Sequence, residues 1–423
     1  MRLLGPFVLA AAIPLLFLHR NYQPGVDVGS AHIDLSDLAV LAVVLAALAE
    51  RRFPRGRVWL GAFALALLVL AGVAWGAARF DAYPTHTHLT TAAKWIEYML
   101  LAPAVAVIVR RSRDLVPAAV VLVAWDAIAG VVGLLQFVGA LGDLDGTPAG
   151  RRKPSFIGYH DYAAVSGASL VLALVVVARG ARSARERAIA SVAGVAGGVG
   201  LVLGGAFDSL LGIVLAAAGI AVVTRLRDGR RLLAIGTILA AVAVGVVGIR
   251  SSAVADGLKF LGVKQGNGGA STHIQSYRQR VLLAYIGGRE FLANPGLGVG
   301  WQGSADPYAF EPYLADAHKR FDQPDEAFPS QQRRWGVQNA YVQSLADLGF
   351  LGLPVFLAAF LVPALLAARR GYGDARVAGV ALPLLVLGAW NGYGLVAGIP
   401  LDALTWLGVG VAAASLSLVR STA

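Results

Sequence analysis

Three arginines lie within one short segment that the sequence predicts to be helical, residues 276–292. Arg278 and Arg289 are eleven residues apart and share a helix face, whereas Arg280 points elsewhere. The planar guanidinium group binds phosphate oxygens in pairs through charge-assisted hydrogen bonds. We therefore expect these side chains to bind a diphosphate, with Arg280 as the principal catalytic candidate because its helix leads into the turn at 294–300. The alternative is that the arginines only contact lipid headgroups.

A second group of candidate residues surrounds the start of another predicted helix. Arg152 and Lys153 lie just before it, and Tyr159, His160 and Asp161 stand at the entry to an apolar run. Ionisable groups in a membrane helix are usually functional or paired. We predict that Arg152, Lys153 and Tyr159 bind substrate and that His160 and Asp161 take part in catalysis, although adjacent residues cannot face one direction on a helix. The alternative is a structural hydrogen-bonding role.

A third group opens a later apolar run. Gln338, Asn339 and Tyr341 begin this run, shortly after Arg334. The free N–H groups and the dipole at the start of a helix favour an anion. We predict that Arg334, Asn339 and Tyr341 bind substrate and that Gln338 contributes to catalysis. The alternative is that this segment only caps the helix at the membrane interface.

The segment between the first and third groups of candidate residues is rich in side chains that could act as general bases. They are Asp306, Glu311, Asp316, His318, Asp322, Asp325 and Glu326. We take Glu326 as a catalytic candidate among them. His86 and His88 lack a third ligand at a suitable spacing, and the chain has no Cys. We therefore expect neither a metal nor a cofactor.

Composition places these groups in a membrane protein. The chain of 423 residues is 57% hydrophobic and only 14% charged, whereas soluble domains carry about 25% charged residues. A net charge of +11 would suggest a nucleic-acid partner for a soluble protein. Here blocks of arginine follow the ends of apolar runs, so we predict membrane lipids as partners and no nucleic acid.

The apolar runs predict an all-α integral membrane protein with about twelve transmembrane helices, since a span needs about 17–25 residues. With a cytoplasmic N-terminus and alternating spans, the inside segments hold 20 of the 36 Lys and Arg and the short outer loops hold five. This bias follows the positive-inside rule and predicts that both termini are cytoplasmic. The runs are 3–19, 33–50, 58–78, 93–109, 115–141, 159–178, 188–205, 208–224, 232–249, 337–368, 377–394 and 399–419.

The same pattern divides the chain into three parts. Residues 1–249 hold spans one to nine, residues 250–336 form a long outer loop, and residues 337–423 hold spans ten to twelve. The loop has too many aromatic residues for disorder, so we expect it to be partly helical and to carry part of the active site. Residues 265–271 are predicted to form a flexible hinge within it.

Four motifs follow one another along residues 150–365. They are the segment Ser155–Ala163, a helix pair joined by a tight turn, Arg280 placed fifteen residues before Pro295, and the segment Asn339–Gly352. In this order they resemble the bacterial O-antigen ligase and O-antigen polymerase superfamily. The resemblance implies a glycosyltransferase at the outer face of the bacterial inner (plasma) membrane, which passes a glycan from undecaprenyl diphosphate to an acceptor sugar hydroxyl with inversion and without a metal. It also implies that Arg280 holds the diphosphate.

Two positions depart from that family. Ligases typically have His immediately before the Asn of the last motif, and here that position is Gln338. A Gln side chain cannot act as a base near neutral pH, although it can orient a hydroxyl. The tight turn often carries Ser-Arg, and here it reads Phe207-Asp208, which loses a second arginine. The base would then be His160, Asp161, Glu326 or His318, or the chemistry would be altered.

The sequence leaves several functions open. A ligase adds one glycan to a glycan or glycolipid acceptor, whereas a polymerase of the same superfamily extends a surface polysaccharide. A flippase or transporter of lipid-linked glycans would instead require ionisable groups deep in several helices and broken helices near the midplane. A peptidoglycan polymerase of the shape-and-division type also uses a lipid diphosphate, but it resembles these motifs less.

Overall fold

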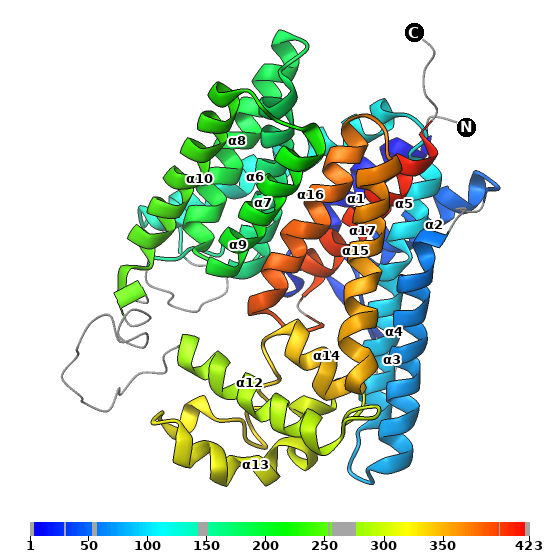
Figure 1. Cartoon of the computed structure of the whole chain (residues 1–423), viewed down its shortest axis with the longest axis vertical. Coiled ribbons are helices and arrows are strands. Elements are labelled where there is room, and N and C mark those ends of the chain that lie inside the picture. The colour runs from blue at the N-terminus through cyan, green and yellow to red at the C-terminus, as the bar shows by residue number, and fades with distance from the viewer. Residues whose placement is uncertain are drawn as a thin grey trace.

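Long apolar runs fold into helices that pack side by side in one bundle (Figure 1). The computed structural model describes residues 4–28, 31–52, 57–142, 151–252, 254–255, 276–396 and 398–418. The helices are α1 (Leu4–Leu16), α2 (Leu35–Ala49), α3 (Leu60–Arg79), α4 (Thr85–Met99), α5 (Leu101–Ile108), α6 (Val116–Phe137), α7 (Tyr159–Arg179), α8 (Ala184–Gly204), α9 (Phe207–Thr224), α10 (Gly229–Ile249), α12 (Ser276–Ala293), α13 (Pro307–Arg320), α14 (Ala340–Leu348), α15 (Gly352–Arg370), α16 (Gly373–Ala389) and α17 (Ile399–Ser417). One antiparallel hairpin, β1 (Gly25–Val28) and β2 (Ala31–Asp34), joins α1 to α2.

Ten helical segments of the described chain are long and apolar enough to cross a membrane. They coincide with the last ten of the twelve predicted runs. The first two runs correspond to α1 and α2, whose 13 and 15 residues fall short of the usual span. The chain is therefore an all-α, multi-pass membrane protein, and the number twelve stays a prediction.

The tenth predicted run is interrupted at Gly349, which separates α14 from α15. Gly349 has a φ of +70°, a conformation that favours glycine, and a Cβ there would overlap the backbone of Gly296. The chain bends because the turn after α12 packs into this break. Val299 N donates to Ala346 O at 2.8 Å, and Phe350 N donates to Pro295 O at 2.9 Å. These bonds fasten the end of α12 to the bundle.

The described part of the long loop is a small folded unit with its own hydrophobic core. α12, α13 and the 3-10 turn η5 (Asp325–Ala327) bury a shared apolar cluster. Its fully or nearly fully buried members are Leu282, Leu283, Ile286, Phe310, Ala317, Ala327 and Phe328. We refer to residues 276–336 as the outer unit. The predicted hinge at 265–271 lies outside the described residues.

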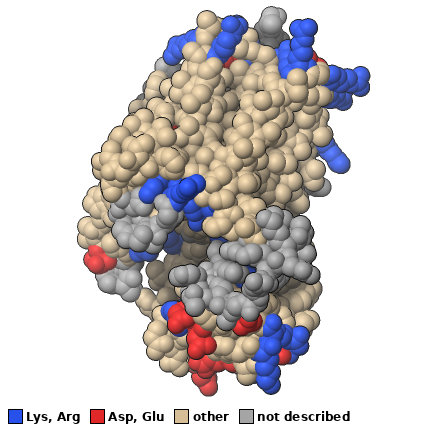
Figure 2. All heavy atoms as spheres, turned by 90° about the vertical axis from the view of Figure 1, so that its left-hand side faces the viewer, with Lys and Arg blue, Asp and Glu red and all other residues tan. Residues whose placement is uncertain are grey.

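The outer unit lies against one end of the bundle, while the start of α1 and the end of α17 lie at the opposite end (Figure 1). Lys and Arg side chains gather at the opposite end as well. A second group of cations borders the hollow between the bundle and the outer unit (Figure 2). The second group therefore lies at the end of the bundle that carries the outer unit, where the sequence predicts part of the active site.

Helices α9 and α16, which carry parts of this site, cross through a pair of glycines. A Cβ on Gly388 of α16 would overlap the backbone of Gly212 on α9, and small residues are what allow membrane helices to approach so closely. We expect Gly388→Ala to lower stability by about 1–3 kcal/mol, measured as a lower thermal midpoint in detergent. Gly236→Ala on α10 is the matched control, because a Cβ there meets no atom within 4 Å and should be neutral or stabilising. Equal midpoints for the two variants would contradict the close crossing.

Candidate functional site

Arg280 and His160 approach each other although 120 residues separate them along the chain. The Nη2 atom of Arg280 on α12 lies 3.4 Å from Nε2 of His160, in the first turn of α7. On the other side of the imidazole, Nδ1 lies 3.5 Å from Oδ2 of Asp208 in the first turn of α9. Because an arginine can only donate, we assign Nε2 as the acceptor and place the proton on Nδ1, facing Asp208. The imidazole is thus oriented between a guanidinium and a carboxylate.

Two further arginines meet at the turn between α8 and α9. The Nε atom of Arg152 donates to Gly204 O at 2.8 Å, and Nη1 of Arg250 donates to Gly205 O at 3.1 Å. Burial lowers the pKa of Arg152 to about 10, with a further lowering by the positive charge of Arg250. Burial and the charge of Arg280 likewise lower the pKa of Arg250. The three guanidinium groups therefore repel one another, and a bound anion would relieve this repulsion.

We call Arg152, Arg250 and Arg280 the arginine cluster. The Nη2 atom of Arg152 and the Nε atom of Arg280 are buried donors with no hydrogen-bond partner among the described residues. Buried donors are rarely left unpaired. The three cations and the Asp208 carboxylate sum to a charge of two positive units when His160 is neutral. The cluster thus suits a ligand with about two negative charges and several acceptor oxygens.

At the turn between α8 and α9 this chain has Asp208, whereas the family that the sequence resembles often has an arginine there. In the structure, Arg250 brings a guanidinium to this turn from the C-terminal end of α10. The turn therefore has a nearby cation that comes from another element. Asp208 itself faces His160, so His160 pairs with this distant carboxylate and not with its neighbour Asp161.

The third predicted group lies beside the arginine cluster but is mostly used for structure. Asn339 caps α14, accepting from the N–H groups of Tyr341 and Val342 at 3.1 and 3.0 Å. Its amide nitrogen donates to the backbone oxygen of Asn391 at 3.0 Å, and the hydroxyl of Tyr341 donates to Leu387 O. These contacts match the structural alternative for Asn339 and Tyr341.

Gln338 is linked to the arginine cluster only through its neighbour in the chain. It directly precedes Asn339, which is bonded to the 3-10 turn η7 (Trp390–Gly392). A Cβ on Gly392 would overlap the Asp208 carboxylate and lie 2.9 Å from Nη1 of Arg280. Gln338 itself is half-buried, and its role in catalysis stays a prediction.

Three other candidate bases lie elsewhere. Asp161 interacts with the backbone N–H of Leu401 at the start of α17. Glu326 is exposed on η5, and His318 stacks on the ring of Phe328 with centroids 3.6 Å apart. Of the bases proposed from the sequence, His160 is the one that touches Arg280.

The remaining predicted binding residues are spread around the cluster. Tyr159 places its ring 4.8 Å from the Arg152 guanidinium, and the backbone N–H of Lys153 donates to Leu203 O at 2.9 Å. In the outer unit, Arg289 lies over the ring of Tyr313 at 5.9 Å. The other two arginines, Arg278 and Arg334, also lie in the outer unit; Arg334 pairs with Asp306 at 3.2 Å, and Arg278 lines a small cavity. The structure thus brings Tyr159, Arg152, His160 and Arg280 together and leaves Arg278, Arg289 and Arg334 apart.

Sequence reasoning missed Arg250 and the role of Asp208. Arg250 directly follows an apolar run, at the first position of the predicted long loop. Asp208 stands out in the sequence only as the residue that replaces an arginine at the tight turn. The sequence offers one indication of their roles, which is that both lie at the ends of apolar runs on the same predicted side of the membrane.

Glu290 on α12 provides a test of the outer unit's attachment. Its side chain is fully buried and neither oxygen has a partner among the described residues; burial and the charge of Asp347 raise its pKa well above 4.5. Because the pKa of this carboxyl is higher in the folded state, the folded state keeps its proton at pH values where the unfolded state has lost it. The free energy of unfolding therefore falls as the pH rises above about 4.5. We expect Glu290→Gln to raise the thermal midpoint at pH 8–9 and to flatten its pH dependence.

The exposed Glu311→Gln is the control for this prediction. Thermal unfolding of both variants and the parent protein between pH 5 and 9 gives the comparison. The same pH slope in parent and Glu290→Gln would contradict a buried, protonated Glu290.

Among the described residues, no group of three or more His, Asp or Glu side chains is arranged to hold a metal ion. The charged donors at the site are cations, which suit an anionic ligand. No protein-family model matches this chain, and no curated protein is significantly similar to it.

Proposed function

We propose that this protein is a membrane glycosyltransferase that moves a glycan from undecaprenyl diphosphate to a sugar hydroxyl of a glycan or glycolipid acceptor, as in O-antigen ligases. The observation that carries the proposal is the arginine cluster with its unpartnered buried donors, placed where the bundle meets the outer unit. A lipid-linked diphosphate has one negative charge on each phosphate, which matches the net charge of the cluster. The motif order from Ser155 to Gly352 supports the same function.

In the proposed reaction, the acceptor oxygen attacks the anomeric carbon as the bond from that carbon to the diphosphate breaks. The lipid diphosphate leaves with the bonding electron pair, and the configuration at the anomeric carbon inverts. The arginine cluster stabilises the charge that develops on the leaving group, which is usually a large contribution to catalysis. The acceptor's proton passes to Nε2 of His160 once Arg280 has turned toward the diphosphate, while Asp208 holds the imidazole in place.

The proposed orientation follows the charge pattern. Arginines at the end that holds the start of α1 and the end of α17 favour a cytoplasmic location for that end. The arginine cluster then lies at the outer face of the bacterial plasma membrane. A glycan attached there extends toward the outer unit.

The test is transfer by purified protein in vesicles, given an undecaprenyl diphosphate-linked oligosaccharide and a glycolipid acceptor. Release of lipid diphosphate with transfer of one oligosaccharide supports a ligase, and a ladder of products supports the polymerase alternative. Movement of the donor across the vesicle membrane without bond cleavage would contradict the proposal and favour a flippase.

A further inference from the structure

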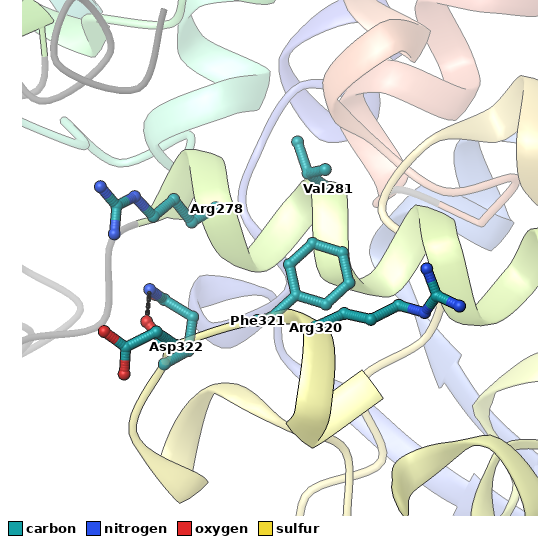
Figure 3. Close-up of a pocket in the computed structure, with 6 residues that line it drawn as sticks. Arg278, Val281, Arg320, Phe321 and Asp322 are labelled. Carbon is teal, nitrogen blue, oxygen red and sulfur yellow. Dashed lines mark hydrogen bonds between the residues drawn. The ribbon is translucent and has the colours of Figure 1, made fainter. Parts of the chain in front are cut away.

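A cavity of about 140 Å³ lies in the outer unit between α12 and the segment that follows α13. Arg278 and Val281 line it from α12, and Phe321, Asp322 and Gln323 line it from the other side. Figure 3 shows Arg278 and Val281 on α12 above Phe321 and Asp322, which follow the end of α13. At roughly 10–15 Å³ for each water-sized position, the cavity has room for about ten such groups, comparable with the heavy atoms of one sugar ring.

The cavity contains polar atoms that lack partners. The Nε donor of Arg278 and the Oε1 acceptor of Gln323 are both buried and have no hydrogen-bond partner among the described residues. The amide nitrogen of Gln323 donates to Asp322 O at 2.5 Å, which fixes its orientation and leaves the oxygen available. Both atoms therefore belong to residues that line the cavity, and both are buried without a hydrogen-bond partner among the described residues.

The two cations that line this cavity, Arg278 and Arg320, differ in their ion pairs. Arg320 is bound to Asp316 at 3.2 Å through Nε and lies over the ring of Tyr285 at 5.3 Å. Figure 3 shows the guanidinium of Arg320 pointing away from that of Arg278. Arg278 has no ion pair with the described residues, so its planar fork can bind a carboxylate.

The remaining lining suits a sugar ring. The face of the Phe321 ring is electron-rich and attracts weakly positive hydrogens, such as the C–H groups on one face of a pyranose. The Asp322 carboxylate and Gln323 Oε1 accept hydrogen bonds from hydroxyl groups. One aromatic ring, two acceptors and a guanidinium that has no ion pair within the described part of the chain match a sugar that carries both hydroxyls and a carboxylate.

We propose that this cavity is a glycan subsite that binds one sugar residue, an acidic sugar more tightly than a neutral one. The inference rests on the proposed function for its physiological ligand, because a glycan on the lipid diphosphate must extend from the arginine cluster into the outer unit. Arg278 and Arg280 are two residues apart and point to opposite sides of α12. A helix with its side chains is about 10–12 Å across, so the subsite holds a sugar some units away from the one that reacts.

Ligand-observed saturation-transfer NMR on the full-length protein in nanodiscs tests the subsite, with methyl β-D-glucuronide and methyl β-D-glucoside as probes. We expect the glucuronide to receive saturation from the protein and the glucoside to receive less. Arg278→Gln should weaken glucuronide binding at least about tenfold, because it removes a charge-assisted hydrogen bond. Phe321→Leu should weaken the binding of both probes, because it removes the aromatic ring but keeps an apolar side chain in the cavity lining.

Lys319→Gln is the matched control, since this exposed cation on α13 does not line the cavity. Thermal unfolding shows whether each variant is folded. The subsite is overturned if neither probe binds the parent protein, or if folded Arg278→Gln and Phe321→Leu bind as the parent does.

The outcome is separate from that of the proposed function. Binding of undecaprenyl diphosphate reports on the arginine cluster, whereas binding of the glucuronide reports on the cavity that Arg278 lines. Glucuronide binding without any glycan transfer would support the subsite and contradict the transferase. Transfer without glucuronide binding would support the transferase and contradict the subsite.

Discussion

Arg280→Gln is expected to reduce the rate of glycan transfer about a hundred- to a thousand-fold, the usual effect of removing one donor to a developing negative charge. Arg280 is the member of the arginine cluster that also contacts His160, so its loss removes both a diphosphate ligand and the contact that orients Nε2. Arg280→Lys should recover only part of the rate, because an ammonium keeps the charge but not the planar fork.

The measurement is single-turnover release of lipid diphosphate by the reconstituted protein. Arg333→Gln is the matched control, because it removes an arginine of the outer unit that lies at a different position, near the backbone of Asp325. A folded Arg280→Gln variant with an unchanged rate would disprove the assigned role.

His160→Gln is expected to reduce kcat about 10²–10⁴-fold while it changes the KM for the lipid-linked donor little. The amide of Gln can occupy the space and accept a hydrogen bond from Arg280, but it cannot take the acceptor's proton. The parent protein should lose activity at low pH as His160 becomes protonated, and this acidic limb should be absent in the residual activity of the variant.

Asp208→Asn separates orientation from proton transfer. It keeps the size of the side chain and removes the charge that holds the Nδ1 proton, so it should lower kcat less than His160→Gln does. His86→Gln, an exposed histidine on α4, is the control. Full activity in His160→Gln would show that the base is another group.

Hydropathy and charge were sufficient to predict much of the fold, for a physical reason. Within a bilayer each backbone polar group must be bonded inside its own helix, so a long apolar run such as Phe207–Thr224 has few alternatives. The break at Gly349 was not predicted. It depends on the turn at Pro295 packing into the gap, a contact between segments 54 residues apart that no local pattern reveals.

The candidate site was predicted to the extent that side-chain chemistry alone could suggest it. Arg280, Arg152 and His160 were chosen because arginine suits phosphate and because ionisable groups are rare in membrane helices, and the structure places the three together. Arg250 and Asp208 could not be assigned, since their roles depend on how the ends of α9 and α10 meet α7. Asn339 and Tyr341 show the converse, because a residue that suits an anion site equally suits a helix cap.

Retention of undecaprenyl diphosphate by the purified protein, followed by native mass spectrometry, tests the central claim most directly. The comparison uses the parent protein, Arg250→Gln, and Arg227→Gln, an exposed arginine between α9 and α10. If the arginine cluster holds the lipid diphosphate, Arg250→Gln will bind this lipid at least about tenfold more weakly, and Arg227→Gln will bind it as the parent does. Equal retention by all three proteins would contradict the account.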